Sequence, residues 1–379
     1  MDFKFTEEQE AIREAIRDLA QNEFAPKAEH YDETGEFPWE NVKKLAQYGF
    51  LGMVIPEQYG GTEADTLSHT ICMEEVAKAC AATSVIMEVH NTLHCEPFVK
   101  FGNDEQKARY MPRLATGELL GAFALTEPNA GSDAANQSTT AVRDGDSYVL
   151  NGRKNFISNG AVADLYIVFA VTDKTKGTKG ISAFLVEKGT EGLSFGLPEK
   201  KMGIRASHTT DVILENCRIP AANLLANEGD GFKIAMTTLD GGRIGIGAQA
   251  LGIAQAALDA AVNYAKTRVQ FGKPIGQLQA VAWMLAEMAT EVEAARWMVY
   301  RAAWLKDQGG RCDKEVAMAK LYASTVASKH TNKAVQIHGG YGYIQDYHVE
   351  RMMRDAKITE IYEGTSEIMK LIISANLLK

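Results

Sequence analysis

Leu165-Tyr166-Ile167-Val168-Phe169-Ala170-Val171 is the clearest structural signal in this chain, a short run of mostly β-branched and aromatic residues without polar interruption. Such runs are typical of buried β-strands. Similar short runs lie nearby, at Tyr148–Leu150, Ile181–Val186 and Asp211–Leu214. Turn dipeptides such as Lys179-Gly180 separate them, and no helix-length pattern intervenes. We therefore expect an antiparallel barrel or sandwich of about 100 residues, and no parallel sheet with crossover helices.

The sequence on both sides of this β region has helical patterns. Near the N-terminus, Thr6 and Gln9 have the spacing of a capping box, and an apolar stripe at helical spacing follows them. After Gly229 the helical pattern returns in long segments rich in Ala, Met and Leu, which is typical of an antiparallel bundle. These long segments are 231–265, 277–307 and 313–338.

The change of pattern along the chain predicts three domains. They are an N-terminal α-helical domain at 1–120, a central β domain at 121–226 and a C-terminal α-helical domain at 227–379. The expected fold class is α+β with mostly α content. A length of 379 residues agrees with several domains, because single cores rarely grow beyond about 250–300 residues.

Composition and charge exclude several classes of protein. A net charge of −9 argues against a nucleic-acid-binding surface and against docking on anionic membranes. The five cysteines are scattered without a Cys-x-x-Cys pair, which fits a reducing compartment and excludes a disulfide scaffold. We see no signal-peptide core, no transit pattern and no apolar run that approaches membrane-spanning length. We therefore expect a cytoplasmic protein without membrane insertion.

Glu363 is the leading candidate for a catalytic carboxylate. It lies between Tyr362 and Gly364, just ahead of an apolar run. Gly364 permits positive φ, so Glu363 can sit at a sharp exit from regular structure. A carboxylate that a ligand covers there loses water, its pKa rises, and it becomes a base near neutral pH. An ordinary helix end has the same local pattern, so the tripeptide alone is weak.

Two segments of the β region carry groups that could bind a ligand. Thr126 and Ser132 flank a Pro-Asn-Ala-Gly turn whose backbone amides can form an anion nest, although an ordinary surface turn has the same composition. Phe156 and Ser158 end a strand at a tight turn. An aromatic ring and a hydroxyl there can cover and hydrogen-bond a planar ring, or Phe156 can simply belong to the core.

The C-terminal third carries further polar segments. Arg268 opens a loop between two helices, where a guanidinium can bind pyrophosphate or simply interact with the helix C-terminus. Gln336 precedes a glycine-dense helix exit that matches neither a Rossmann nor a P-loop fingerprint. Asp240 and Arg243 form a pair at the start of a long helix, which is more often structural than a ligand contact.

His90 and His94 have the helical spacing of a metal pair. Because Asn91 follows the first histidine where a zincin motif has Glu, packing is favoured and no metal site is predicted. With Glu88 nearby, this predicted helix is unusually polar.

Taken together and in this order, these segments resemble the acyl-CoA dehydrogenase family of flavoproteins, in particular short-chain, butyryl-CoA dehydrogenase-like members of the bacterial type. The resemblance covers essentially the whole chain. It rests on the ordered set Leu125–Asp133, Phe156–Ser158, Arg268–Gly272, Gln336–Gly340 and Tyr362–Glu367. It implies an N-terminal helical domain, a central β domain, a C-terminal four-helix domain and a homotetramer, a dimer of dimers that holds FAD partly across a subunit interface.

The resemblance also implies roles at matching positions. Glu363 falls where most members carry the catalytic base; some relatives place that base near Gly242, where this chain has no Glu. The residues expected to hold FAD are Phe123, Leu125, Thr126, Ser132, Phe156, Ile157, Ser158, Arg268, Phe271, Gln279, Gln336, Gly339, Gly340, Thr365 and Glu367. Arg268 and its neighbours are expected to reach the FAD of a partner subunit. The residues expected to contact acyl-CoA are Ser132, Asp240, Arg243, Tyr362 and Gly364.

In this family the base removes the proton α to a thioester while FAD takes a hydride from the β-carbon, which gives a trans-2-enoyl-CoA. The enolate that develops is expected to accept hydrogen bonds from the Glu363 backbone amide and from a flavin ribityl hydroxyl. The electrons normally pass to electron-transfer flavoprotein. The expected partners are therefore an acyl-CoA and electron-transfer flavoprotein.

The resemblance leaves the substrate and the direction open. The polar helix with Glu88, His90, Asn91 and His94 would lie beneath the acyl pocket, which favours a short, branched or cyclic acyl group. It lacks the arginine that members for glutaryl-CoA carry near this region. An acyl-CoA oxidase or an enoyl-CoA reductase on the same scaffold are alternatives. An inactive assembly protein is another, against which the intact Glu363 argues.

Overall fold

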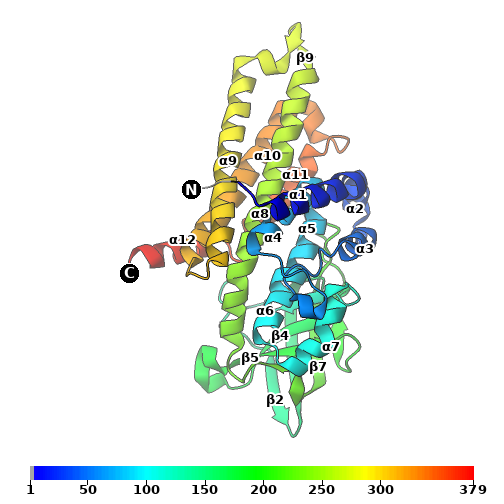
Figure 1. Cartoon of the computed structure of the whole chain (residues 1–379), viewed down its shortest axis with the longest axis vertical. Helices are drawn as coiled ribbons and strands as arrows, with labels where there is room; N and C mark the ends of the chain where they lie inside the picture. Colours follow the sequence, from blue (N-terminus) through cyan, green and yellow to red (C-terminus); the bar gives the residue numbers. More distant parts are fainter. Residues whose placement is uncertain (1–3) are drawn as a thin grey trace.

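The computed structural model describes residues 4–379, and it is an elongated molecule in which the three predicted parts are distinct. In Figure 1 the strands of the central part lie at the lower end, the N-terminal helices cross the middle, and the long C-terminal helices rise to the top. One helix, α8 (Gly231–Thr267), runs through almost the full height of the molecule. The β region and the helical region therefore share one long central helix.

The N-terminal part is helical, as predicted. The Thr6 hydroxyl accepts from the Gln9 amide at 3.1 Å and the Gln9 side chain accepts from the Thr6 amide at 3.1 Å, which confirms the capping box. The helices are α1 (Glu7–Leu19), α2 (Ala28–Thr34), α3 (Trp39–Gln47), α4 (Thr66–Ala79), α5 (Ala81–Glu88), α6 (Glu96–Phe101) and α7 (Asp104–Ala115). Between α5 and α6 the chain widens into a π-helical segment, η4 (Val89–Cys95).

The central part is one eight-stranded sheet. Its strands are β1 (Gly121–Ala124), β2 (Thr140–Asp144), β3 (Ser147–Ser158), β4 (Leu165–Val171), β5 (Ile181–Glu187), β6 (Leu193–Phe195), β7 (Thr209–Pro220) and β8 (Leu224–Leu225). The order is β6-β7-β3-β2-β4-β5-β8, and β1 pairs with β4 off this path. Most pairs are antiparallel, but β1 and β2 both pair with β4 in parallel, so the expectation of a purely antiparallel sheet was wrong at this point.

Strand β4 explains why its sequence is apolar throughout. Leu165, Ile167 and Phe169 face the large core that the sheet shares with the helices, whereas Tyr166 and Val168 face a second core inside the curved sheet. Both faces of the strand are thus buried, so neither needs polar side chains.

The C-terminal part is a bundle of long helices, as predicted. They are α8, α9 (Gln279–Asp307) and α10 (Asp313–His338), followed by the shorter α11 (Val349–Ile358) and α12 (Ser366–Leu377). Helix α8 packs between α10 on one side and α4 on the other. By length and composition α8 could cross a membrane, which the sequence expectation did not foresee, but 83% of that apolar window is buried inside the protein.

Candidate active site

Glu363 lies in the turn between α11 and α12 and has a φ of +51°, in the left-handed region. A non-glycine residue in such a conformation costs about 1–3 kcal/mol, so the surrounding structure must hold it. The next residue, Gly364, has a φ of +107°. The chain therefore leaves regular structure sharply at the candidate base, as the Glu-Gly sequence predicted.

Two buried cations hold the backbone of this turn. Arg243 of α8 donates from Nε to the Glu363 carbonyl oxygen at 3.2 Å, and its Nη1 donates to Asp240 Oδ1 at 2.6 Å. Lys320 of α10 is fully buried and donates to the Gly364 carbonyl oxygen at 2.6 Å. The two long helices thus fix the turn from both sides, and this contact gives the Asp240–Arg243 pair a structural role.

The Glu363 carboxyl group is seated on the glycine face of α8. A methyl group at Gly242 would collide with Glu363 Oε2 and would also crowd the Leu93 side chain, so only glycine leaves room here. Oε2 is buried and has no hydrogen-bond partner among residues 4–379. Burial raises the pKa of Glu363 to about 7, against the opposing positive charges of Lys320 and Arg243. The carboxylate can therefore accept a proton near neutral pH.

The backbone amide of Glu363 is a second reactive group of the turn. Within the described part of the chain, this N–H donates to no backbone or side-chain acceptor. A free amide beside a buried carboxylate is the arrangement that stabilises an oxyanion next to a proton-transfer site.

The polar helix anticipated from the sequence divides into two faces. His90 accepts from the Gly121 amide at Nδ1 (3.1 Å), so its Nε2 donates to the Leu114 carbonyl oxygen (3.1 Å). His94 Nδ1 donates to the Ala122 carbonyl oxygen at 3.0 Å, and Asn91 bonds to the backbone of the loop after α3. These three side chains join η4 to β1 and that loop. Only Glu88 faces α8, where it is fully buried against Gly245.

Burial lowers the pKa of His90 to about 4 and that of His94 to about 3, so both imidazoles are neutral. The Nδ1 atom of each ring makes the backbone contact with β1. No cluster of three or more His, Cys, Asp or Glu side chains within residues 4–379 is placed to hold a metal ion.

The loop after β1 lies beside the end of β3, which brings two predicted segments together. The Asn155 amide donates to the Thr126 carbonyl oxygen at 2.8 Å, and Phe156 follows with a φ of +56° and a ring that is 63% exposed. Asn155 Oδ1 is buried without a partner. Ser132 is exposed in the same loop. This region therefore presents an exposed ring and unused polar atoms at one edge of the sheet.

Not every predicted side chain of this region is exposed to a ligand. Ile157 is packed in the core inside the sheet, Leu125 is buried, and Phe123 packs edge-on against Phe169 at 4.8 Å. Any contact that Ile157 makes with a ligand must come from its backbone.

A buried ion pair that the sequence did not reveal fixes this loop. Lys154 of β3 is fully buried and donates to Glu127 Oε1 at 2.8 Å and to the Leu125 carbonyl oxygen at 3.1 Å. The other carboxylate oxygen of Glu127 accepts from the amide and hydroxyl of Ser138. The local sequence around Lys154 is an ordinary strand pattern and did not predict this ion pair.

The remaining predicted residues lie far away, at the top of the molecule. Arg268 begins the hairpin of β9 (Val269–Gln270) and β10 (Lys273–Pro274), and its guanidinium lies 5.2 Å from the ring centre of Tyr341. Phe271, at the hairpin tip, is 89% exposed. Gln279, Gln336, Gly339 and Gly340 are also exposed. Along α8, Arg268 lies about 40 Å from Gly242, farther than one extended FAD reaches.

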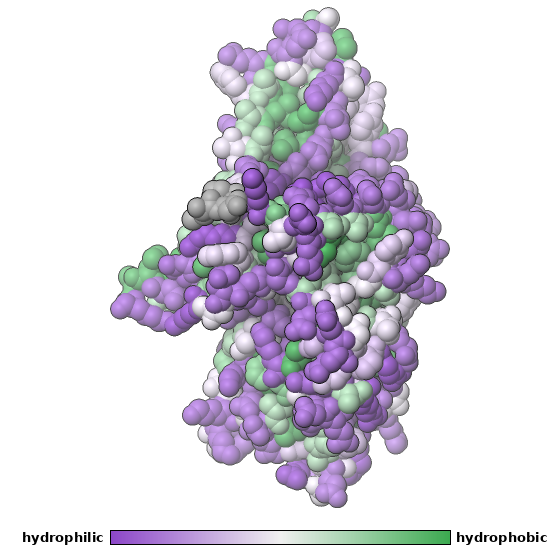
Figure 2. Space-filling model, viewed as in Figure 1, coloured by the Kyte–Doolittle hydropathy of each residue, from purple (hydrophilic) through white to green (hydrophobic). Residues whose placement is uncertain are grey.

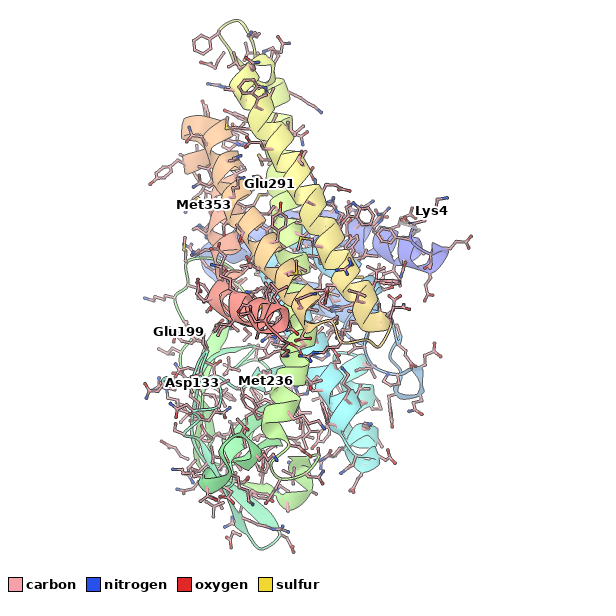
Figure 3. The ribbon with its side chains drawn as sticks, turned by 90° about the vertical axis from the view of Figure 1, so that its left-hand side faces the viewer. Lys4, Asp133, Glu199, Met236, Glu291 and Met353 are labelled. Atoms are coloured by element: carbon pink, nitrogen blue, oxygen red, sulfur yellow. The ribbon has the colours of Figure 1, made fainter. Side chains whose placement is uncertain are left out.

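Figure 3 shows this separation from the side. Asp133, in the loop after β1, and Met236 of α8 lie in the lower half, whereas Glu291 of α9 and Met353 of α11 lie higher up. Thr365 and Glu367 stay with the lower group, because Thr365 caps α12 directly after the Glu363 turn. Within one chain the predicted cofactor contacts therefore form two separate groups.

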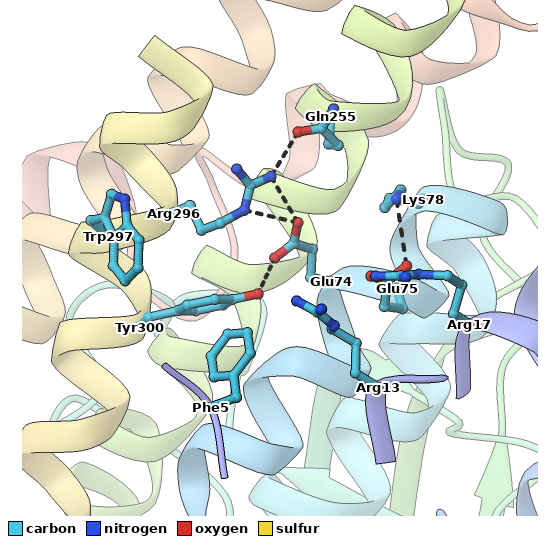
Figure 4. Close-up of a pocket in the computed structure, with 10 residues that line it drawn as sticks. All are labelled: Phe5, Arg13, Arg17, Glu74, Glu75, Lys78, Gln255, Arg296, Trp297 and Tyr300. Carbon is cyan, nitrogen blue, oxygen red and sulfur yellow. Dashed lines mark hydrogen bonds and ion pairs between the residues drawn. The ribbon is translucent and has the colours of Figure 1, made fainter. Parts of the chain in front are cut away.

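A separate cavity lies elsewhere in the structure. A polar pocket of about 310 Å³ lies between the N-terminal segment, α4 and α9, shown in Figure 4. Its central carboxylate, Glu74, accepts from Arg296 at 3.0 Å and from the Tyr300 hydroxyl at 2.5 Å. Glu75 binds Arg17 at 2.7 Å in the same way. The acidic groups of this pocket are thus neutralised by its own cations, and none of the predicted site residues lines it.

Comparison with known proteins settles the family. The models of the N-terminal, middle and C-terminal domains of acyl-CoA dehydrogenase match residues 6–118, 122–217 and 229–378. The chain belongs to the acyl-CoA dehydrogenase family. It is therefore an FAD-dependent oxidoreductase.

Individual relatives are similar over their full lengths. The chain is 53% identical to the short-chain specific acyl-CoA dehydrogenase of Clostridium acetobutylicum over 379 residues, all of both chains. It is also 53% identical to the NADH-dependent acryloyl-CoA reductase of Anaerotignum propionicum, over all of this chain and 96% of the relative. A chain in a structure titled for the electron transferring flavoprotein of Acidaminococcus fermentans superposes with a TM-score of 0.99 at 50% identity, and both chains are covered completely.

The residues of the lower group fit an acyl-CoA dehydrogenase cofactor. A flat ring with polar edges matches the exposed face of Phe156 and the unpartnered Asn155 Oδ1 beside Thr126. The loop is linked to Glu363 through the structure, because β1 is hydrogen-bonded to η4, and Leu93 of η4 lies against Gly242. The candidate flavin-binding edge and the candidate base are thus joined by contacts through β1 and η4.

Proposed function

We propose that this chain interconverts a short acyl-CoA and its trans-2-enoyl-CoA, with Glu363 as the group that takes the α-proton. One observation carries the proposal: Glu363 Oε2 is buried and unpartnered on Gly242, while the backbone of the turn is fixed by Arg243 and Lys320. A base that is held in place and kept free of hydrogen-bond donors needs no reorganisation before it accepts a proton.

The same turn supplies the electrostatic part of the reaction. A thioester carbonyl beside Glu363 would accept from the free Glu363 amide, which lowers the energy of the enolate as the α-proton leaves. Arg243 and Lys320 add positive charge behind the turn without touching the carboxyl oxygens. FAD, when bound, supplies the acceptor for the β-hydride. We assign the edge with Leu125, Thr126, Ser132 and Phe156 to its ring system.

The acyl end of the site favours a short chain. The Tyr362 hydroxyl donates to Gln249 of α8, so these two side chains close the space next to Glu363. Leu93 limits it from η4. A long aliphatic chain would have to displace these groups, whereas a four-carbon acyl group would not.

We further propose that two copies of the chain complete each cofactor site within a tetramer. The exposed group of Arg268, Phe271, Gln279, Gln336, Gly339 and Gly340 would reach the FAD of a neighbouring copy. Figure 2 shows apolar side chains gathered over the upper helices. Val269 (52% exposed) and Trp283 (61% exposed) lie in this part of the chain, and a neighbouring copy would cover them.

Electron-transfer flavoprotein is the proposed redox partner, on the basis of the similar chain in the structure titled for that protein. We place the reaction in the cytoplasm. The opposite direction, reduction of an enoyl-CoA, is a second candidate, because the reductase of Anaerotignum propionicum is as similar as the dehydrogenase of Clostridium acetobutylicum. Release of peroxide under air would instead indicate an oxidase.

Glu363→Gln tests the proposed base. The variant should bind FAD normally, but the rate of anaerobic flavin bleaching by butyryl-CoA should fall at least about 100-fold, the usual contribution of general base catalysis. Glu360→Gln, three residues earlier in the same turn, is the matched control and should bleach at the rate of the unmodified protein. Unchanged bleaching in Glu363→Gln would remove Glu363 from this role.

A single titration distinguishes the two directions. The oxidised protein is mixed with butyryl-CoA, and the dithionite-reduced protein with crotonyl-CoA, both without oxygen. A faster spectral change in the first mixture supports a dehydrogenase, and a faster change in the second supports a reductase.

A further inference from the structure

Glu88 is a second buried carboxyl group at the acyl end of the same site. A methyl group at Gly245 would collide with its carboxyl atoms, just as one at Gly242 would collide with Glu363. Gly242 and Gly245 are three residues apart on α8, so the two carboxyl groups sit on successive turns, about 4.5 Å apart along the helix axis. Helix α8 therefore has two neighbouring glycines that leave room for acidic side chains: Gly242 for Glu363 and Gly245 for Glu88. Only Glu363 is the proposed base.

One of the two carboxyl oxygens of Glu88 lacks a hydrogen-bond partner in the described part of the chain. The Thr92 hydroxyl donates to Oε1, but Oε2 has no hydrogen-bond partner and is buried. His69 Nε2 of α4 lies 3.7 Å from Glu88 Oε2, which is too far for a hydrogen bond. His69 Nε2 is buried and unpartnered as well. Two buried polar atoms thus lie 3.7 Å apart without a hydrogen bond to each other or to another described residue. This arrangement costs free energy unless a third group bridges them.

The cations of the neighbourhood are already engaged. Lys306 binds Glu96 at 2.8 Å, Lys320 binds the Gly364 carbonyl oxygen, and Arg243 binds Asp240 and the turn. An anionic acyl group would find no free positive charge at Glu88.

Burial disfavours the charged form of both members of the pair. Burial, with the nearby Glu363 charge, raises the pKa of Glu88 well above its usual value, and the Thr92 hydrogen bond only partly opposes this. Burial lowers the pKa of His69 to about 4. A neutral carboxylic acid can donate and a neutral imidazole can accept, so a hydroxyl group between them could satisfy both atoms.

We propose that Glu88 and His69 select an acyl group that carries a hydroxyl at its γ-carbon, with the hydroxyl bridging Glu88 Oε2 and His69 Nε2. The inference rests on the proposed function, because Glu363 fixes where the α-carbon lies. Glu88 of α5 then acts as a specificity-determining residue, because its carboxyl group packs against Gly245 of α8, three residues after Gly242. A purely aliphatic acyl group of the same length would leave both polar atoms without partners, which is how buried polar groups reject analogues.

The test compares trans-enoyl-CoAs of matched size, because their rigid double bond prevents a γ-hydroxyl from closing on the thioester. The dithionite-reduced holoenzyme is reoxidised without oxygen by crotonyl-CoA, trans-pent-2-enoyl-CoA, 4-hydroxycrotonyl-CoA and 4-aminocrotonyl-CoA. We expect 4-hydroxycrotonyl-CoA to have a KM at least about tenfold lower than trans-pent-2-enoyl-CoA, with a similar maximal rate.

Three variants localise the effect. Glu88→Gln keeps a donor and an acceptor and should preserve the preference, whereas Glu88→Leu should reverse it in favour of trans-pent-2-enoyl-CoA. Glu96→Gln removes a different, partly buried carboxyl near α8 and should leave the preference unchanged. FAD content reports folding, and the comparison of substrates on the unmodified protein does not depend on any variant.

The outcomes separate this inference from the proposed function. Equal KM values for the hydroxylated and aliphatic compounds, or a clear preference for 4-aminocrotonyl-CoA, would overturn the inference while the proposed function stands. Failure of every enoyl-CoA to reoxidise the flavin would overturn both.

Discussion

Glu363 and Phe271 have the same backbone conformation in opposite settings. Both are non-glycine residues with a φ of +51° next to a glycine with positive φ. The turn at Glu363 is bound by Arg243 and Lys320, and its carboxyl group is buried. Phe271 lies at the tip of a hairpin, 89% exposed.

The difference shows which half of the site a single chain completes by itself. Strain at Glu363 is balanced by contacts within the chain, so the proton-transfer group is preorganised before any ligand arrives. Phe271 combines the same positive φ with an almost fully exposed ring, which fits the proposed contact with a neighbouring copy. In the proposed arrangement, one copy therefore supplies the proton-transfer group, and binding of the far end of the cofactor needs residues of two copies.

Gly242→Ala should have the largest effect on activity, because it disturbs the region around Glu363. The added methyl group meets Glu363 Oε2 and Leu93, so the carboxyl must leave its seat while the helix itself accepts alanine well. We expect acyl-CoA-dependent bleaching to slow at least about 100-fold with FAD still bound.

Gly247→Ala is the matched control on the same helix. Its nearest contact would be Val299 Cγ2 at 3.3 Å, which requires only a small shift. Its bleaching rate should stay within about threefold of the unmodified protein. Equal rates for the two variants would mean that the seat at Gly242 does not position the base.

Phe271→Ala should have the second-largest effect and act on the other region. Because the ring is almost fully exposed in one chain, the free energy of unfolding of the apoprotein should change by less than about 0.5 kcal/mol. FAD should nevertheless dissociate about tenfold more readily from the assembled protein. Urea unfolding of the apoprotein and fluorescence of released FAD measure the two quantities; unchanged FAD retention would contradict a role for this tip in the cofactor site.

Lys320→Met should have the smallest effect of these variants. It should change kcat/KM little at high pH and lower it clearly at low pH. The unmodified enzyme should gain activity as pH rises through about 7, because Glu363 works as a base only when ionised. Lys320 favours that ionised form, so its loss should raise the pKa of Glu363 and move the rise in kcat/KM to higher pH by about one unit. Lys329→Met, on the exposed face of the same helix, should leave the profile in place.

Much of this arrangement was predictable from the sequence. Helical periodicity and the β-rich runs predicted a helical, a β-sheet and a helical segment in that order, because binary patterns report directly on the period of each element. Glu363 was predicted from its glycine neighbour and from the resemblance. The parallel pairing of β1 and β2 with β4 was missed, because strand order depends on contacts between distant segments.

The supporting residues were less visible. Lys154 and Lys320 are single cations in ordinary local patterns, and their role follows only from which carbonyl oxygens the fold brings within reach. The spacing of Val316, Ala319 and Ala323 does place Lys320 beside an apolar helix face, which was an unused signal. Glu88, His90, Asn91 and His94 looked alike in sequence, and only tertiary packing distinguishes Glu88 from the three that bond to the backbone.

Helix α8 sets the spacing between the two regions, because it carries Gly242 near its lower end and leads directly into Arg268 at its upper end. One residue inserted between these points would rotate the hairpin by about 100° around the helix axis and advance it by about 1.5 Å. The hairpin would then point away from any neighbouring copy, although every residue of the lower site would be untouched. For the proposed assembly, the length of this helix would thus itself be a constraint, as strict as the identity of any side chain that it bears.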